Sequence, residues 1–456
     1  MSSNRMNPQE LRASIGLSGI YGLRMLGMFV ILPVFAIYAE HLPGGNNLTL
    51  VGIAIGAYGL TQAMLQIPFG WWSDRYGRKP VIYAGLVLFA LGSFVAALGH
   101  HILVVIAGRV LQGMGAISAA VMALAADLTR DEHRTKAMAM IGSTIGMTFA
   151  VSLVASPWLN HVIGVPGIFA MTGLLALAAI VVVRRVIPDV PAHEAAGNRH
   201  AAGQFRRVFA DPQLLRLNFG IMALQAVLMA LFIAVPFSLR AAGLDVAHHW
   251  QVYLPVMLGS FVLMLPAVLG ARKAGQMKAV FIGSVALLLA GYVAMPWLMG
   301  SLWLIASFLL VFFTAFNVLE ACLPSLISRM APADAKGTAI GVYSSVQFFG
   351  SFFGAAGGGF LYQHWRIAGV TVFAVVLLAM WLVLALGMKV PVTLSKRIYT
   401  IPELDRKQAD SLVAELHTLP GVRKARVVAA ERAAYLEVDS AAFDEQNVLK
   451  LIAGGT

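Results

Sequence analysis

Apolar runs about as long as the hydrocarbon core of a bilayer is thick follow one another along most of the chain. Because a backbone in hydrocarbon must satisfy its own polar groups, such runs predict transmembrane helices. The chain is 59% hydrophobic and 12% charged, about half the charge of a soluble protein. We therefore expect an all-α polytopic membrane protein. The twelve predicted spans cover roughly 12–39, 49–72, 80–99, 102–126, 137–158, 163–184, 213–240, 249–271, 277–298, 301–327, 337–361 and 367–388.

Basic residues between the spans predict the orientation of the chain. If the N-terminus is cytoplasmic, the outer loops contain only Arg240 and Arg366. The inner segments then contain Arg5, Arg12, Arg75, Arg78, Lys79, Arg130, Arg134, Lys136, Arg184, Arg185, Arg199, Arg206, Arg207, Arg272, Lys273, Lys278, Arg329 and Lys336. By the positive-inside rule, this asymmetry predicts both termini in the cytoplasm. The expected location of such a multi-pass protein is a bacterial inner membrane. Since the net charge of +12 marks this face, no nucleic-acid partner is expected.

The two halves of the membrane part resemble each other weakly. When the second half is aligned with the first, Pro266 matches Pro68 and Gly275 matches Gly77. Repeated bundles of this kind are found in secondary transporters. We expect two six-helix pseudo-repeats at 1–184 and 213–390, joined by a polar, basic cytoplasmic linker at 185–212.

One short inner loop concentrates charge and glycine. Residues 70–79 read GWWSDRYGRK, which resembles motif A of the major facilitator superfamily, G-x-x-x-D-R-x-G-R-K, at every defining position. The resemblance covers residues 1–395 and implies that family's twelve-helix transporter fold. The matching residues are Gly70, Asp74, Arg75, Gly77, Arg78 and Lys79.

Two further segments resemble motifs of proton-coupled members of this superfamily. RVLQGMGA, which begins at Arg109 and includes Gln112, resembles motif B of the fourth span. Residues 142–151, GSTIGMTFAV, resemble the fifth-span motif of drug antiporters only in part, since Met147 stands where that motif has proline.

The resemblance implies a latch on the cytoplasmic side. Asp74 would lie at the N-terminus of the eleventh span, near Lys336 of the other half, where the helix dipole stabilises a carboxylate. Arg78 would pair with Asp127 at the inner end of the fourth span. The alternative is that these charges only mark the inner face. Asp74 adds nothing to a positive-inside signal, which favours the latch.

Three ionisable residues lie deep within predicted spans, namely Arg24, Arg109 and Glu320. Such residues are functional candidates, because a charge at the centre of a bilayer costs at least about 2.5 kcal/mol. Glu320 is the first candidate proton carrier and Asp127 the second, and the resemblance implies a coupling role for Arg109. The alternatives are a structural hydrogen bond for Glu320 and a packed, paired side chain for Arg24.

Polar residues seldom face lipid, so the substrate cavity is expected to include Gln112 and Asn317, with Arg24. The other polar, Met and aromatic side chains of the spans are assigned to ordinary helix packing.

Residues 397–456 differ from the rest in composition and form a separate soluble α+β domain by our prediction. Their pattern predicts strand, helix, two strands and helix, the βαββα order of a ferredoxin-like fold. LPGV at 419–422 resembles heavy-metal-associated domains, but the preceding loop has no cysteine, so no metal site is expected. We expect a regulatory or homo-oligomerising contact through this domain.

These features together predict a proton-coupled efflux antiporter for small, partly apolar compounds, embedded in membrane lipid. A metabolite symporter, an uncoupled facilitator, and a membrane sensor that signals through residues 397–456 stay open as alternatives. No cofactor and no catalytic residues are expected, because no nucleophile–base pair is visible in the sequence.

Overall fold

The structure is a computed structural model that describes residues 6–189, 201–271, 276–332, 335–389, 394–402, 406–439 and 443–454. The basic residues Arg5, Arg199, Arg272 and Lys273 lie outside the described residues. The chain divides into two compact units, 1–265 with 282–388, and 266–281 with 389–456.

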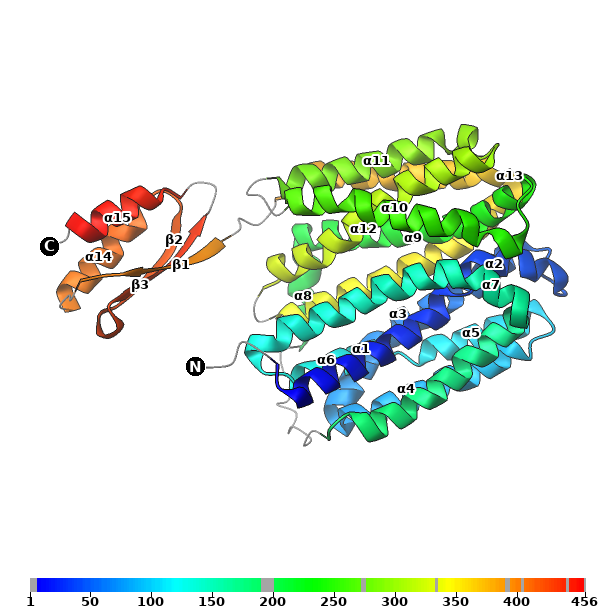
Figure 1. Ribbon diagram of the computed structural model, residues 1–456, viewed down its shortest axis with the longest axis horizontal. Coiled ribbons are helices and arrows are strands. Elements are labelled where there is room, and N and C mark those ends of the chain that lie inside the picture. Colours follow the sequence, from blue (N-terminus) through cyan, green and yellow to red (C-terminus); the bar gives the residue numbers. More distant parts are fainter. Residues whose placement is uncertain are drawn as a thin grey trace. The chain divides into compact units, whose positions relative to one another are not determined.

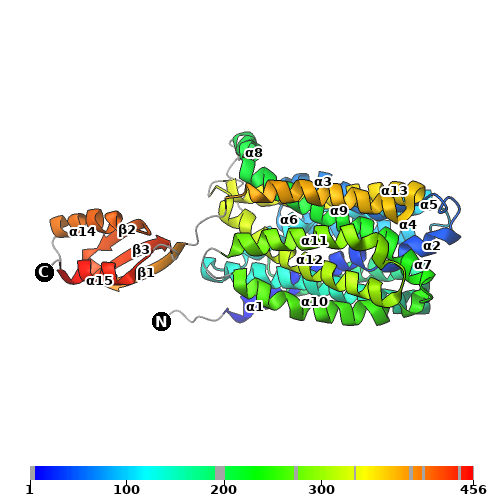
Figure 2. The same ribbon diagram turned by 90° about the horizontal axis from the view of Figure 1, so that it is seen from above.

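The described residues of 8–265 and 282–388 consist mainly of long helices packed side by side (Figures 1 and 2). They are α1 (Pro8–Phe29), α2 (Leu32–Tyr38), α3 (Leu48–Tyr76), α4 (Arg78–Ala97), α5 (Ile102–Met114), α6 (Ser118–Asp127), α7 (Asp131–Val186), α8 (Ala201–Ala210), α9 (Pro212–Ala241), α10 (Trp250–Ala271), α11 (Met277–Leu298), α12 (Leu302–Met330) and α13 (Lys336–Leu386). Helix α8 lies in the segment predicted as a linker.

Ten helical stretches of the described chain are long and apolar enough to cross a membrane. Two of them are far longer than one crossing needs: α7 has 56 residues and α13 has 51. Each contains one residue with non-helical dihedral angles, Gly164 in α7 and Arg366 in α13. The prediction of twelve crossings divides α13 at 362–366, which includes Arg366, and divides α7 at 159–162, just before Gly164.

The predicted span 102–126 is not one continuous helix. Helix α5 ends at Met114 and α6 begins at Ser118, with Gly115 at φ −71° and ψ 50° between them. Gly115 packs so closely against α4 that a Cβ atom there would overlap the carbonyl oxygen of Gly85. Apolar periodicity continues through this break, so hydropathy alone does not reveal it.

The two halves pack tightly at one end of the bundle, the Glu40 end, which also contains Gly52 and Arg240. A Cβ atom on Gly52 of α3 would overlap the backbone of Ala355 in α13. Arg240 donates hydrogen bonds to both oxygens of Glu40, at 2.6 and 2.9 Å. Direct backbone contact and a bidentate ion pair therefore join the halves at this end.

The opposite end carries residues 70–79 and is named the Asp74 end. The two glycines at the start of α13 make no close contact there. Gly337 and Gly341 lie in the first turns of α13, and a Cβ atom on either would meet nothing within 4 Å. Lys336 and Gly337 are exposed. Close packing between α3 and α13 is thus found toward the Glu40 end.

The C-terminal part of the second unit is named the C-terminal unit. It contains β1 (Leu394–Thr400), α14 (Arg406–Thr418), β2 (Val422–Val428), β3 (Ala433–Asp439) and α15 (Glu445–Gly454). The strands form an antiparallel sheet in the order β1-β3-β2. Leu416 of α14 and Val448 of α15 pack with Leu436 of β3 in one core, so both helices cover one face of the sheet (Figure 1). This is the predicted order of elements, and the ferredoxin-like assignment stays a prediction.

Candidate functional site

Arg78 is the centre of the polar contacts at the Asp74 end. Its guanidinium forms an ion pair with Asp74 and donates to Asp127 Oδ2 at 3.0 Å and to Ser73 Oγ at 2.9 Å. Gly77, between α3 and α4, has φ +94°, a conformation that side chains other than hydrogen resist. The motif therefore joins α3 and α4 to the end of α6, and Arg78 and Asp127 are brought together.

The remaining motif residues contact the first half and the start of the segment predicted as a linker. Lys79 donates to the carbonyl oxygen of Ile187 at 2.7 Å and to Asp189 at 2.6 Å. The guanidinium of Arg75 lies 5.5 Å from the centre of the Trp71 ring. At Gly70, a Cβ atom would meet Ala119 at 3.4 Å, an ordinary contact.

Among the described residues, the ion pair and hydrogen bond of the Asp74 side chain are with Arg78 and not with the start of α13. The Asp74 side chain is 54% exposed. The proposed latch partner, the helix start at Lys336, is also exposed. The structure thus brings together the Arg78 part of the predicted network but not its connection to the other half.

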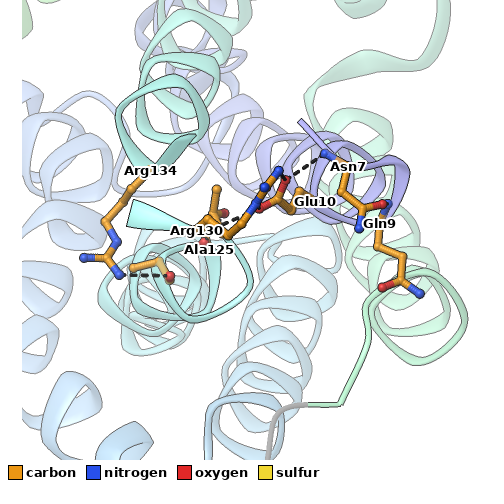
Figure 3. A network of polar contacts seen from close by, with 8 residues as sticks. Asn7, Gln9, Glu10, Ala125, Arg130 and Arg134 are labelled. Atoms are coloured by element: carbon orange, nitrogen blue, oxygen red, sulfur yellow. Dashed lines mark hydrogen bonds and ion pairs between the residues drawn. The ribbon is translucent and has the colours of Figure 1, made fainter. Parts of the chain in front are cut away.

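A second ion pair anchors the first helix at the same end. Arg130 donates from Nε and Nη2 to the two carboxylate oxygens of Glu10, at 2.9 and 3.0 Å (Figure 3). The same carboxylate accepts from the backbone amide of Asn7, which closes a capping box at the start of α1. The hydrogen bonds to Glu10 raise the pKa of Arg130 above its ordinary value.

Arg109 and Gln112 are fully buried and hold the helices of the first half together. Arg109 donates to the carbonyl oxygens of Gly27, Ala54 and Ile55 at 3.1 to 3.3 Å and to Gln112 at 2.8 Å. Among the described residues, Arg109 has no carboxylate partner. The structure places Gln112 in this packed network rather than on a free surface.

Arg24 is also buried, with 1% exposure, between α1, α3 and α6. Its Nη1 donates to Ser118 Oγ at 2.6 Å, and its guanidinium lies 5.7 Å from the centre of the Tyr58 ring. Gln62 also donates to Ser118 Oγ, at 3.3 Å. Ser118 is the first residue of α6, so Arg24 lies at the break in the fourth span.

Glu320 lies in the second half, on α12. Its carboxylate accepts from Gln347 Nε2 at 3.0 Å and from Gln225 Nε2 at 3.3 Å. Asn317, one turn earlier, donates to Ser260 Oγ at 3.1 Å. In the described part of the chain, the ion pairs do not include Glu320, so neutral amides are its partners.

An aromatic cluster lies on the Glu40 side of Arg24 and Glu320. Phe149 of α7 has its ring centre 5.0 Å from that of Phe29 in α1 and 6.0 to 6.5 Å from those of Phe316 in α12 and Phe232 in α9. Arg24 precedes Phe29 by about 7.5 Å along α1, and Glu320 follows Phe316 by about 6 Å along α12. Since α1 and α12 run in opposite directions, both ionisable groups lie on the Asp74 side of the cluster.

Several residues of this centre do not stand out in the sequence. Tyr58, Ser118, Gln225 and Gln347 belong to helices whose apolar pattern gives no sign of their partners. Only the two glutamines could have been identified from the sequence as residues of the centre, because polar side chains within spans seldom face lipid. Glu40 and Arg240 lack even this indication, since both lie at the ends of spans.

The apolar helices form a bundle from two halves, which has ionisable side chains at its centre and tight contact at one end. This is the architecture of a secondary transporter. The chain belongs to the Major Facilitator Superfamily, whose model matches residues 17–355. It is therefore a transporter and not an enzyme.

Known relatives and solved structures agree with this family. The chain is 43% identical over 443 residues to the inner membrane transport protein YajR of Escherichia coli (strain K12), covering 96% of this chain and 97% of that protein. Multidrug resistance protein 2 of Bacillus subtilis (strain 168) is 26% identical over 78% of this chain and 90% of its own length. The crystal structure of a bacterial homologue of the human lysosomal transporter Spinster has a TM-score of 0.68 at 14% identity, covering 83% of this chain and 97% of that one.

Proposed function

We propose that the protein is a proton-coupled transporter that exports small, partly apolar compounds across a bacterial inner membrane. The single observation that carries the coupling is the position of Glu320. A carboxyl group inside the bundle whose partners are neutral amides is not held ionised by a neighbouring cation. It therefore has the freedom to take up and release a proton as its surroundings change.

Alternating access supplies that change of surroundings. The halves are joined at the Glu40 end in this structure, and we infer from this that the centre of the bundle is reached from the Asp74 end. With the Asp74 end in the cytoplasm, as the basic residues predict, this is the inward-facing state. In the outward-facing state, Asp74 would meet the start of α13 and close the cytoplasmic side.

Export is the direction that the relatives favour. A protein named for multidrug resistance aligns with most of the chain, and another relative is named as an inner membrane transport protein. The aromatic cluster around Phe149, whose rings pack on one another in this structure, would supply apolar contacts to such compounds.

The test compares uphill transport with exchange in vesicles that contain the purified protein. Glu320→Gln keeps the shape and hydrogen bonding of the side chain but removes its exchangeable proton. We expect this variant to retain counterflow of a substrate found by panel screening and to lose accumulation driven by a pH gradient. Glu132→Gln, an exposed carboxylate near the start of α7, is the matched control and should behave as wild type.

Wild-type accumulation by Glu320→Gln would rule out Glu320 as the proton carrier. Asp127 would then be the next acid to test. Loss of both counterflow and accumulation, in a folded variant, would assign Glu320 to substrate binding or structure instead.

A further inference from the structure

The strongest unexplained feature of the bundle is the edge of Arg24 that faces away from Ser118. Arg24 Nε and Nη2 are buried and have no hydrogen-bond acceptor among the described residues. No described carboxylate pairs with this guanidinium, although the residue is only 1% exposed. A buried charge with unmet donors is costly unless something of opposite charge compensates it.

Two other arginines of this half use the corresponding donors. Arg109 shares Nε, Nη1 and Nη2 among three carbonyl oxygens and Gln112. Arg130 holds the Glu10 carboxylate with Nε and Nη2, the same two atoms that lack an acceptor on Arg24 (Figure 3). That edge of a guanidinium matches a carboxylate in geometry as well as in charge.

A helix N-terminus lies at the same place. Helix α6 begins at Ser118, the residue that accepts from Arg24, and its N-cap Ile117 provides no side-chain cap. The first amide groups of a helix and its dipole favour an anion. Broken helices in transporters direct such ends at anionic substrate groups.

Tyr58, whose ring contacts Arg24, carries another buried donor. Its hydroxyl has no partner among the described residues, and its ring centre lies 5.7 Å from the guanidinium carbon of Arg24 and 5.0 Å from that of Arg109. The aromatic cluster begins about 7.5 Å farther along α1, at Phe29. Polar donors and apolar surface therefore lie within the length of one small amphiphilic molecule.

We propose that the compounds carried by this protein are organic carboxylates. Their anionic group is bound by the Nε and Nη2 edge of Arg24 at the N-terminus of α6, with the Tyr58 hydroxyl as a further donor, and their apolar part lies toward the aromatic cluster. This inference rests on the proposed transport function and specifies its substrate class.

The experiment measures binding to the purified full chain in detergent. Benzoate, phenylacetate and cinnamate are each compared with the corresponding amide, which has nearly the same shape but no charge. Thermal unfolding followed by tryptophan fluorescence gives the stabilisation by each compound, and titration gives the dissociation constant. We expect the carboxylates to stabilise the wild-type protein and the amides to have little effect.

Variants locate the site. Arg24→Gln should weaken carboxylate binding by about 10- to 100-fold and remove the preference over amides. Arg24→Lys keeps the charge without the planar edge and should be intermediate, while Tyr58→Phe should cost a few-fold. Arg12→Gln, the same substitution at an exposed position of the same helix, is the control and should bind as wild type.

Absence of any carboxylate preference in the wild-type protein would overturn the proposal, whatever the variants do. A preference that survives in folded Arg24→Gln would place the anion site elsewhere and overturn it too. If carboxylates bind through Arg24 but a pH gradient drives no accumulation, the substrate site stands and the proposed coupling fails. Gradient-driven transport of neutral or cationic compounds, without carboxylate binding, would support the coupling and overturn the substrate class.

Discussion

Arg78 contacts two carboxylates that come from different helices, Asp74 in α3 and Asp127 in α6. The side chains of Arg78 and Asp127 are 22% and 27% exposed, so their direct contribution to stability is modest. The main effect of these ion pairs is to fix the positions of Asp74 and Asp127 relative to Arg78. Asp74 pairs with Arg78 within the first half, and the proposed latch requires Asp74 to exchange this partner for the start of α13.

Asp74→Asn tests that exchange. A carboxylate at a helix N-terminus contributes up to about 2 kcal/mol, so losing it should reduce closure of the Asp74 end several-fold. Crosslinking between Tyr76→Cys and Ile340→Cys, in a Cys322→Ser background, measures this closure. Asp245→Asn, an exposed acid elsewhere, is the control. Equal crosslinking with and without the Asp74→Asn substitution would remove the latch from the mechanism.

Helices α3 and α13 show how small residues decide which end of the bundle closes. Gly52 and Gly359 let the backbones of these helices touch at the Glu40 end, where any side chain would overlap a carbonyl oxygen. No close approach of this kind involves Gly337 or Gly341 at the Asp74 end. The two helices therefore meet firmly at one end and can separate at the other.

Gly52→Val should oppose closure of the Glu40 end, because overpacking costs about 1–3 kcal/mol. A cost of about 1–2 kcal/mol shifts a population by a factor of about 5 to 30. We expect faster labelling of Phe237→Cys by a membrane-impermeant maleimide added from outside. Gly283→Val, at a glycine whose Cβ would meet nothing within 4 Å, is the matched control. Unchanged labelling of the Gly52 variant would mean that the helices repack without opening.

At the scale of the whole molecule, the C-terminal unit has its own hydrophobic core. Tyr399, Leu416, Leu436 and Val448 pack together, and every member of this core comes from residues 399–452. A core of this size suits a small domain that is only marginally stable alone. The membrane part and the tail are thus expected to fold separately.

Deleting residues 397–456 should therefore leave the helical bundle able to insert and fold. We expect normal amounts in the membrane, a monodisperse peak in size-exclusion chromatography and a melting temperature close to that of the full chain. Counterflow should persist in reconstituted vesicles. A truncated protein that aggregates or is degraded would show that the bundle needs the tail to fold.

Much of the architecture could be predicted from the sequence because hydropathy and charge act locally. Apolar runs locate the helices, loop charges suggest their orientation, and the pattern after residue 397 predicts the observed order of strands and helices. Arg24, Arg109 and Glu320 stand out for the same reason, since each is a charge in an apolar run. Properties that depend on one segment alone, such as its hydropathy and charge, can be predicted from the sequence of that segment.

Tertiary structure decided everything that depends on two segments meeting. Arg24 and Ser118 are far apart in the chain. The interruption of the fourth span, which places a helix N-terminus beside Arg24, has no counterpart in the hydropathy of the sequence. Likewise, Arg109 and Arg24 look alike in the sequence, and only packing distinguishes them. Arg109 donates from Nε, Nη1 and Nη2, whereas Nε and Nη2 of Arg24 have no described acceptor. The closed state of the Glu40 end depends on glycine contacts between halves. Hydropathy records how a residue partitions between water and lipid, whereas its partners are set by how helices pack.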